Sequence, residues 1–386
     1  MSSFVIAHIS DLHLSSFGDT LVDRQYRVKR SALSVSFNAR RHELCLEIEG
    51  WSIVRDRLFR KKVFLIDPEG YRHSVKQSSL DQDGLDPVEQ AACIALQLES
   101  RRALTLAKEL PSPAALDALL QETPRNVNLR FLSSLQQICA AKPDVILITG
   151  DLTDNGSGYE LIEAAFAPWV PDMRLLAVRG NHDAYLLPVL GSDRPRPTRE
   201  TKNKAWLNFA HRIGLDLDES GAWCVAYAEA GLIVVGLDSC TQPPPRFFRH
   251  NGSIGALQLD YIQQIARTVA WQKARHRLVA FHHHIVPLSK GIGKRHPPEM
   301  GMKLDDAPEV AKVLNEIGAT IILHGHRHIS EHRHPAGCHF QLLSSPSLTL
   351  GCKSGDTPSF WRLELGNHVQ VSRVRLSHGE RIPSEG

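Results

Sequence analysis

The chain has 386 residues, of which 42% are hydrophobic and 23% are charged, and its formal net charge is +3. That length allows one large domain or two, and the composition is that of an ordinary soluble globular protein. So small a net charge gives no sign of a nucleic-acid binder or a membrane-surface protein. Seven scattered cysteines without a CxxC pair argue against a disulfide framework and against a thiolate zinc site.

The N-terminal segment MSSFVIAHISDLHL contains a short apolar run, which predicts a buried strand, and the polar residues Asp11 and His13 follow it. The segment lacks a basic start, and His8 interrupts the apolar run before it could form the core of a signal peptide. No later apolar stretch has the length of a membrane span. We therefore expect a cytoplasmic protein without a membrane anchor.

Residues 20–124 do not follow the pattern of the rest of the chain and are predicted to form a small α+β insertion. The stretches ELCLEIEG and KKVFLI alternate as strands do, and residues 86–121 have helical spacing. Residues 20–76 hold 13 Lys and Arg against 7 Asp and Glu, a net charge of +6. A solvated basic face explains this charge most simply, and an anion-binding lid is the alternative. The main domain is then expected over residues 1–19 and 125–386.

Four further apolar runs end abruptly in polar turns, as the first one does. DVILIT leads into GDLTDNG, RLLAV into RGNHD, RLVAF into HHH, and TIIL into HGHRH. Helical segments such as NVNLRFLSSLQQICAA and DAPEVAKVLNEIGA lie between them. This alternation predicts an α/β layered fold, in which ligands collect beyond the carboxyl ends of the strands. After about residue 337, the runs HFQLLSS, FWRLELG and HVQVSRVRL predict a closing antiparallel edge.

The polar residues at these strand ends offer oxygen and nitrogen donors and no thiolate. They are Asp11, His13, Asp151, Asn181, His182, His282, His283, His284, His326 and His328. Such a set suits zinc, manganese, iron or cobalt and is too rich in nitrogen for calcium or magnesium alone. It is large enough for two ions, and a carboxylate such as Asp151 can bridge them and offset their repulsion. Each motif alone is weak, but the ordered set at five strand ends predicts a metal site.

The ordered motifs resemble those of the calcineurin-like metallophosphoesterases, whose pattern runs DxH, GD, GNH(D/E), H and GHxH. The resemblance covers residues 4–18 and 126 to about 365, and it leaves out the insertion. The stretches SDLHL, GDLTDNG, LDSC before GSIGALQLDYI, and LLSSPSLTLG also resemble the bacterial class III cyclic-nucleotide phosphodiesterases. The resemblance implies a four-layer α/β/β/α sandwich, two divalent metal ions (Mn, Fe, Zn or Co) and hydrolysis of a small phosphoester substrate.

The family's metal ligands can be carried onto the matching positions of this chain. The resemblance assigns Asp11, His13, Asp151 and His328 to one metal. It assigns Asp151, Asn181, His326 and one histidine of the triplet to the other. His282 is the expected member of the triplet because it follows the strand directly, and His283 is its competitor.

His182 and Asp183 are the catalytic residues that the resemblance implies. His182 would stabilise a phosphate oxygen or protonate the leaving group. Asp183 would orient the His182 imidazole, or else cap a helix or turn. The two ions would bind the phosphoryl oxygens and lower the pKa of a water, so that hydroxide attacks phosphorus. In the loop after the histidine triplet, Lys294 and Arg295 would bind substrate or simply face solvent.

These motifs predict a dinuclear-metal phosphodiesterase for a small diester, of the cyclic-nucleotide or glycerophosphodiester type. A phosphomonoesterase, or a nucleotide or lipid pyrophosphatase, is the alternative on the same metal core. A DNA nuclease is disfavoured because it would need a broad basic track, so we expect neither a nucleic-acid nor a membrane partner. A metal-stabilised interaction module without catalysis is the remaining reading. The insertion would serve as a homodimer contact or as a substrate lid.

Overall fold

The computed structural model describes residues 3–14, 34–38, 43–48, 51–56, 63–66, 72–75, 103–122, 126–154, 156, 158–170, 172–185, 198–241, 251–286, 302–350 and 358–377. Between residues 34 and 75 it describes the backbone of five strands. No helix in these ranges combines the length and the apolar character needed to cross a bilayer.

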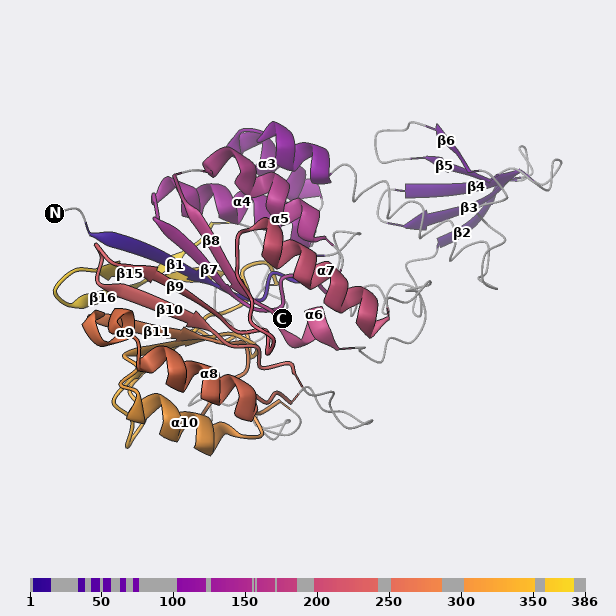
Figure 1. The fold of residues 1–386 in the computed structure, drawn as a ribbon. Coiled ribbons are helices and arrows are strands. Elements are labelled where there is room, and N and C mark those ends of the chain that lie inside the picture. The colour runs from indigo at the N-terminus through magenta and orange to yellow at the C-terminus, as the bar shows by residue number, and fades with distance from the viewer. Residues whose placement is uncertain are drawn as a thin grey trace.

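Two sheets lie face to face in the main body (Figure 1). The first has the strand order β16-β15-β1-β7-β8, and the second has the order β13-β14-β12-β11-β10-β9. The strands of the first are β1 Phe4–Ile9, β7 Val145–Thr149, β8 Arg174–Val178, β15 Ser359–Leu365 and β16 Val369–Arg375. Those of the second are β9 Trp223–Tyr227, β10 Leu232–Gly236, β11 His276–Ala280, β12 Ile321–His324, β13 Glu331–Arg333 and β14 Gln341–Ser344. The five apolar runs expected as strands are β1, β7, β8, β11 and β12.

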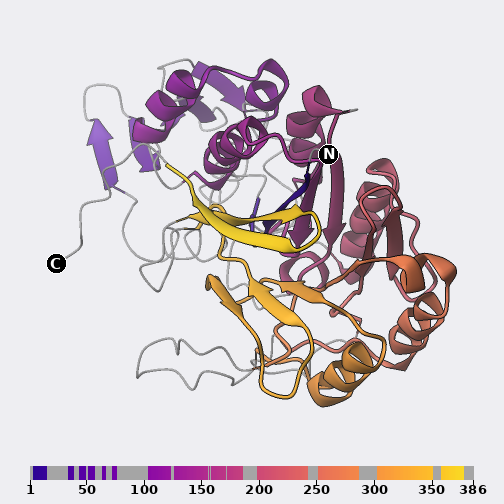
Figure 2. The same ribbon diagram turned by 90° about the vertical axis from the view of Figure 1, so that its left-hand side faces the viewer.

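Helices cover the outer face of each sheet. In Figure 1, α3, α4, α5 and α7 lie over the first sheet, and α8, α9 and α10 lie over the second. Their bounds are α3 Pro113–Glu122, α4 Val127–Ala140, α5 Tyr159–Phe166, α7 Arg199–Arg212, α8 Ala256–Ala266, α9 Val269–Lys273 and α10 Ala307–Glu316. Figure 2 shows the yellow hairpin β15–β16 between the purple helices above it and the orange second sheet below it. The four-layer α/β/β/α arrangement expected from the sequence is confirmed.

The central strands β10, β11 and β12 of the second sheet bury both of their faces. In β10, Val234 packs in the core shared with the first sheet, whereas its neighbour Val235 packs in the core under α8 and α10. In β11, Leu278 and Val279 divide in the same way. Adjacent side chains of a strand point to opposite faces, so a strand between two layers must be apolar throughout. This is why the sequence shows continuous apolar runs.

The C-terminal strands divide between the two sheets, which differs from the single closing edge expected after residue 337. β14 runs parallel to β12 in the second sheet. β15 and β16 form an antiparallel hairpin that pairs with β1 in the first sheet. The sequence pattern of a strand does not encode its partner, so it could not show this division.

Five strands of the predicted insertion form an antiparallel sheet of their own, in the order β2-β3-β4-β5-β6. They are β2 Ser34–Asn38, β3 Glu43–Ile48, β4 Trp51–Asp56, β5 Val63–Ile66 and β6 Arg72–Val75. The helical part differs from the expectation. Ala107 and Leu116 are buried in the core of the main body, and Gln136 of α4 donates to the carbonyl of Pro111 at 2.6 Å. The main core therefore begins before the boundary expected at residue 125.

Candidate metal centre

The loops after β1 and β7 lie side by side and are joined by backbone hydrogen bonds. The amides of Asp11 and His13 donate to the carbonyls of Gly150 and Asp151, at 3.0 and 2.9 Å. Because β1 and β7 run parallel, both loops leave the same edge of the sheet. Asp11, His13 and Asp151 have φ angles of 54°, 49° and 49°. L-residues adopt this left-handed region at a cost, which structures tolerate mainly at functional sites.

The turn after β12 has the same unusual backbone, with φ of 74° at His326 and 52° at His328. Gly325 precedes it, and a Cβ on this glycine would collide with Ser10 Oγ and Asp11 Oδ2. The glycine therefore lets the turn approach the loop after β1. The amide of His326 donates to Asp11 Oδ2 at 3.0 Å. The two outermost motifs of the sequence thus meet directly.

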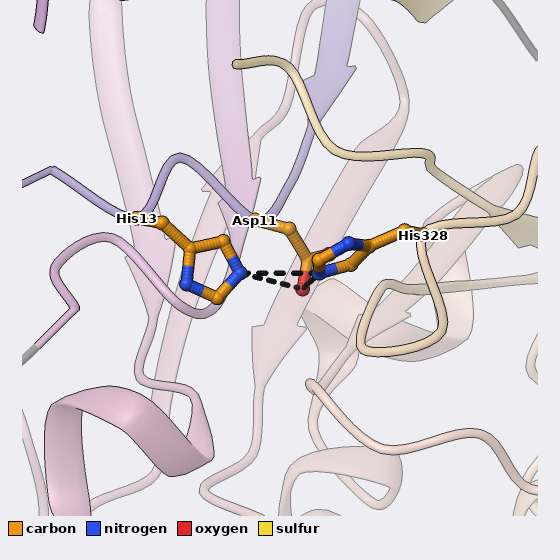
Figure 3. Close-up of side chains that lie close together, drawn as sticks. All are labelled: Asp11, His13 and His328. Carbon is orange, nitrogen blue, oxygen red and sulfur yellow. Dashed lines mark hydrogen bonds and ion pairs between the residues drawn. The ribbon is translucent and has the colours of Figure 1, made fainter. Parts of the chain in front are cut away.

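Asp11, His13 and His328 form a first cluster of donors (Figure 3). His328 Nε2 lies 3.2 Å from Asp11 Oδ1 and 3.1 Å from His13 Nε2. His13 Nε2 is 3.9 Å from Asp11 Oδ1. In Figure 3 the three side chains point toward one another, Asp11 and His13 from the loop after β1 and His328 from the turn after β12. One donor atom from each residue is thus available to a single ion.

A second cluster is centred on His282, which lies two positions after the end of β11. His282 Nε2 lies 3.0 Å from Asn181 Oδ1, 3.1 Å from His326 Nδ1 and 3.4 Å from Asp151 Oδ2. Asn181 begins the short helix α6 Asn181–Ala184, directly after β8. All of these residues are buried. The second cluster is thus also built at strand ends.

Asp151 faces both clusters. Its Oδ2 atom is 3.4 Å from His282 Nε2 and 3.7 Å from His13 Nε2. Burial alone would raise the pKa of Asp151, but neighbouring histidines, His282 foremost, hold it well below its ordinary value. The carboxylate is therefore ionised and can share its charge between two cations.

A hydrogen bond to the backbone fixes the tautomer of His282. Thr149 offers only a carbonyl oxygen to His282 Nδ1, at 2.8 Å, so Nδ1 carries the proton and donates. In the neutral ring, Nε2 of His282 then turns a lone pair toward Asn181 Oδ1, which is also an acceptor. In addition, His326 Nε2 is buried and lacks a hydrogen-bond partner among the residues described, and Asp11 Oδ1 faces the ring nitrogens of His328 and His13 at 3.2 and 3.9 Å. Acceptor atoms packed in this way are relieved by positive charge, either a proton on the ring or a metal ion, so the residues present fit a metal site.

The electrostatics of the site also favour cations. Burial would lower the pKa of His13, but a hydrogen bond to Asp154 and the charges of Asp151, Asp154 and Asp11 raise it to about 9. Burial is likewise outweighed at His282, where Asp151 does most to raise the pKa to about 9. Positive charge on these side chains is therefore stabilised by the carboxylates around them. The same carboxylates would stabilise a divalent metal ion.

Asp154 joins the site without having been predicted. Its Oδ1 atom lies 3.2 Å from His13 Nδ1 and 2.9 Å from His182 Nδ1. Burial would raise the pKa of Asp154, but the hydrogen bonds with His13 and His182 outweigh it and lower the pKa. An ionised carboxylate only accepts, so both histidines donate from Nδ1. The sequence feature that could have identified Asp154 was its position in GDLTDNG, three residues after Asp151.

The geometry does not support the expectation that Asp183 orients the His182 imidazole. Asp183 accepts from the amides of Leu152, Thr153 and Gly180, at 3.0, 2.9 and 2.9 Å. It also accepts from the hydroxyls of Thr153 and Tyr159, at 2.8 and 3.0 Å. These bonds tie the GNHD turn to the loop after β7, which corresponds to the alternative expectation of a capping role.

The remaining predicted site residues are His283, Lys294 and Arg295. The Nδ1 atom of His283 lies 2.7 Å from Ser239 Oγ, whereas His282 Nε2 faces Asn181 Oδ1 and Asp151 Oδ2. This geometry favours His282 over His283 as a ligand. Lys294 and Arg295 lie outside the described residues.

The chain is similar in sequence to known proteins. A sequence model described as the calcineurin-like phosphoesterase matches residues 108–330, which include the end of the helical part of the predicted insertion. A protein of Rhodococcus erythropolis described as a "Probable cyclic nucleotide phosphodiesterase" is 27% identical over 216 residues, which are 54% of this chain and 59% of that protein. The chain thus spans less than two thirds of that relative's length.

Two solved structures illustrate the likeness in three dimensions. A dimetal phosphatase from Danio rerio has a TM-score of 0.47 and 12% identity, with 98% of this chain and 100% of that chain covered. A purple acid phosphatase from yellow lupin (Lupinus luteus) seeds has a TM-score of 0.44 and 13% identity, with 65% of this chain and 48% of that chain covered.

Proposed function

The chain belongs to the calcineurin-like phosphoesterase family, and on that premise we propose that it hydrolyses a small phosphodiester with two divalent metal ions. One observation carries the proposal. The carboxylate of Asp151 lies between two donor clusters, within 3.7 Å of His13 and 3.4 Å of His282. A single metal ion would not need a carboxylate between two donor clusters. Two neighbouring ions do need a shared anion, because it offsets their mutual repulsion.

We assign Asp11, His13, Asp151 and His328 to one ion and Asp151, Asn181, His282 and His326 to the other. These donors suit Mn, Fe, Zn or Co. The ions would neutralise the phosphoryl oxygens and make a water molecule acidic enough to serve as nucleophile at neutral pH. Burial of the ligands helps because it removes competing solvent and strengthens the field at the site.

His182 is the proton donor in this proposal. Its Nδ1–H is held by Asp154, so Nε2 is the ring nitrogen that exchanges a proton with the leaving oxygen. The backbone amide of His182 donates to Asp151 Oδ1 at 2.8 Å, which holds the His182 backbone beside this carboxylate. The His182 side chain is 21% exposed, whereas that of His13 is 3% exposed. His182 is thus the histidine of the pair that can reach a substrate.

The relative from Rhodococcus erythropolis supports the diester class, because it is described as a probable cyclic nucleotide phosphodiesterase. Glycerophosphodiesters are the second class in this proposal. Cleavage of a monoester or a pyrophosphate would use the same residues and differ only in the leaving group.

The experiment that tests the proposal measures hydrolysis of a chromogenic phosphodiester and of its matching monoester. Chelator-treated protein receives Mn, Zn, Fe or Co singly, and the Asp151→Asn variant is assayed in parallel. We expect metal-dependent cleavage of the diester that Asp151→Asn lowers by at least about 100-fold. Cleavage of the monoester alone would replace the phosphodiesterase with a phosphatase, and cleavage of neither by metal-loaded protein would refute both.

A further inference from the structure

Lys202 is a buried lysine on helix α7. The residue is 3% exposed. A buried ammonium group is costly unless its donors are satisfied. Its Nζ donates to the carbonyl of His182 at 2.7 Å and to the carbonyl of Tyr185 at 2.8 Å. The cation is therefore bound to the backbone of the segment that carries His182.

Both acceptors lie in or directly after the short helix α6. The carbonyls in the last turn of a helix have no partner within the helix and carry partial negative charge. A helix of four residues also supplies few hydrogen bonds of its own. The ammonium group of Lys202 satisfies two of these carbonyls and offsets their charge.

The stem of Lys202 crosses the loop that carries Asp154. A Cβ on Gly156 would lie only 2.7 Å from Lys202 Cγ, so the stem rests directly on this glycine. The amide of Gly156 donates to Thr153 Oγ1 at 2.9 Å, within the same loop. One side chain thus contacts the loop of Asp154 and the turn of His182, the two residues that form the hydrogen-bonded pair.

Helix α7 is anchored independently of the ammonium group. Trp206 and Phe209 are buried in the main core, and the Phe209 ring stacks on Tyr159 with a centroid distance of 4.8 Å. These apolar contacts remain when the Lys202 charge is removed. A variant at this position therefore perturbs the His182 turn and leaves the helix in place.

We propose that Lys202 is a positioning residue that keeps the His182 ring against Asp154. The proposal rests on the proposed function, because its effect on turnover requires that His182 act on the substrate. Loss of the ammonium group removes two hydrogen bonds from a charged donor to the His182 segment. The metal ligands that follow β1, β7, β11 and β12 keep their own hydrogen bonds. Asn181 lies in the affected turn, but its side-chain oxygen keeps its 3.0 Å contact with His282 Nε2, which does not involve Lys202. We therefore expect metal binding to be retained while proton transfer is impaired.

The kinetic test compares Lys202→Met with Lys204→Met in the metal-loaded full-length protein. Lys204 is exposed on the same helix and is the matched control. We expect kcat for a chromogenic diester to fall about 10- to 100-fold in Lys202→Met, with KM and a content of two metal ions per chain unchanged. The double variant His182→Ala/Lys202→Met is expected to lose no more than His182→Ala alone, because both changes remove one function. Additive losses, or equal kcat in Lys202→Met and Lys204→Met, would overturn the proposal.

Hydrogen–deuterium exchange gives a readout that does not depend on activity. We expect faster exchange in Lys202→Met than in Lys204→Met, confined to peptides that cover residues 151–156 and 180–185. Unchanged exchange there would overturn the proposal whatever the kinetics show. If the wild type cleaves no ester while exchange rises as expected, the proposed function fails and the positioning role stands. Lys202→Gln, which keeps a neutral donor on a shorter side chain, is measured in the same way if Lys202→Met does not fold.

Discussion

At the scale of single residues, Asp154 links two histidines with different tasks. It holds His13, a proposed metal ligand, and His182, the proposed proton donor, through one carboxylate oxygen. An ionised carboxylate fixes the tautomer of both rings, and it contributes to raising the pKa of His13. The pair His182 and Asp154 therefore replaces the pair His182 and Asp183 that the sequence predicted.

The Asp154→Asn variant tests this link. An amide of the same shape lacks the charge that holds the two Nδ1–H groups, so we expect kcat to fall about 10- to 100-fold, with weaker metal affinity through His13. Steady-state kinetics over a metal titration measure both effects. Asp172→Asn, at an exposed position, is the control and should match the wild type. Wild-type kcat in Asp154→Asn at saturating metal would contradict the assignment.

His8 gives a prediction about acid stability. Burial lowers the pKa of His8 from 6.5 to about 3, and the Asp11 carboxylate opposes this only in part. The unfolded chain therefore binds a proton below pH 6.5 that the folded chain does not take up until about pH 3, so the free energy of unfolding falls as pH drops through this window.

Replacing His8 should remove this part of the pH dependence. In His8→Gln, we expect the loss of unfolding free energy between pH 6 and pH 4 to be smaller than in the wild type by about 2 to 3 kcal/mol. Urea denaturation of the metal-free proteins at each pH measures the difference. Identical slopes would show that His8 is already charged in the folded chain.

The sequence could not assign the roles of Asp154 and Asp183, because those roles depend on tertiary contacts. The ligands were recognisable because their motifs end predicted strands. Asp154 and Asp183 are both acidic residues in turns near ligands, and their sequence context is alike. Only the fold reveals that Asp183 accepts backbone amides while Asp154 accepts imidazoles.

At the scale of elements, the segment after β14 holds the loop after β1. Ser347 Oγ donates to the carbonyl of Asp11 at 2.7 Å, and the amide of Leu348 donates to the carbonyl of Ser10 at 3.1 Å. These bonds support the left-handed conformation of Asp11. The stretch LLSSPSLTLG was noticed in the sequence as a resemblance, and its contacts give that stretch a physical role.

The Ser347→Ala variant measures the contribution of this support. It leaves the buried carbonyl of Asp11 without the Ser347 hydroxyl, so we expect the free energy of unfolding to fall by about 1 to 3 kcal/mol. The affinity for metal should fall as well, because Asp11 is less well held. Chemical denaturation and a metal titration give the two quantities. A change in unfolding free energy below about 0.5 kcal/mol would show that the loop is held by other contacts.

The elements themselves were predictable where hydrophobic periodicity is strong. β1, β7, β8, β11 and β12 follow from continuous apolar runs, and α4 and α10 follow from helical spacing. The pairing of β14 and β15 with different sheets did not follow, because strand patterns do not encode partners. The helices at 103–122 were assigned to the insertion for a similar reason, since an amphipathic helix does not show which core it covers.

At the scale of the whole molecule, the two main sheets and their helices form the unit that holds the proposed metal centre. The sheet β2–β6 pairs with neither of these sheets. Replacing residues 20–100 by a short Gly/Ser linker should therefore preserve cooperative unfolding and a content of two metal ions. The deletion stops before residue 103 because the helices that follow pack in the main core.

Native mass and kinetics of this shortened chain separate the two roles predicted for the insertion. A halved native mass would establish a homodimer contact, and an unchanged mass with an altered KM would establish a substrate lid. Loss of metal content would contradict the claim that the main body alone forms the site.

The central claim is that side chains from five strand ends hold two ions around Asp151. The most direct test is anomalous diffraction from crystals of the protein grown with Mn²⁺. We predict two anomalous peaks per chain on either side of the Asp151 carboxylate, one beside Asp11, His13 and His328 and the other beside Asn181, His282 and His326. A single peak, or no peak beside Asp151, would contradict the account.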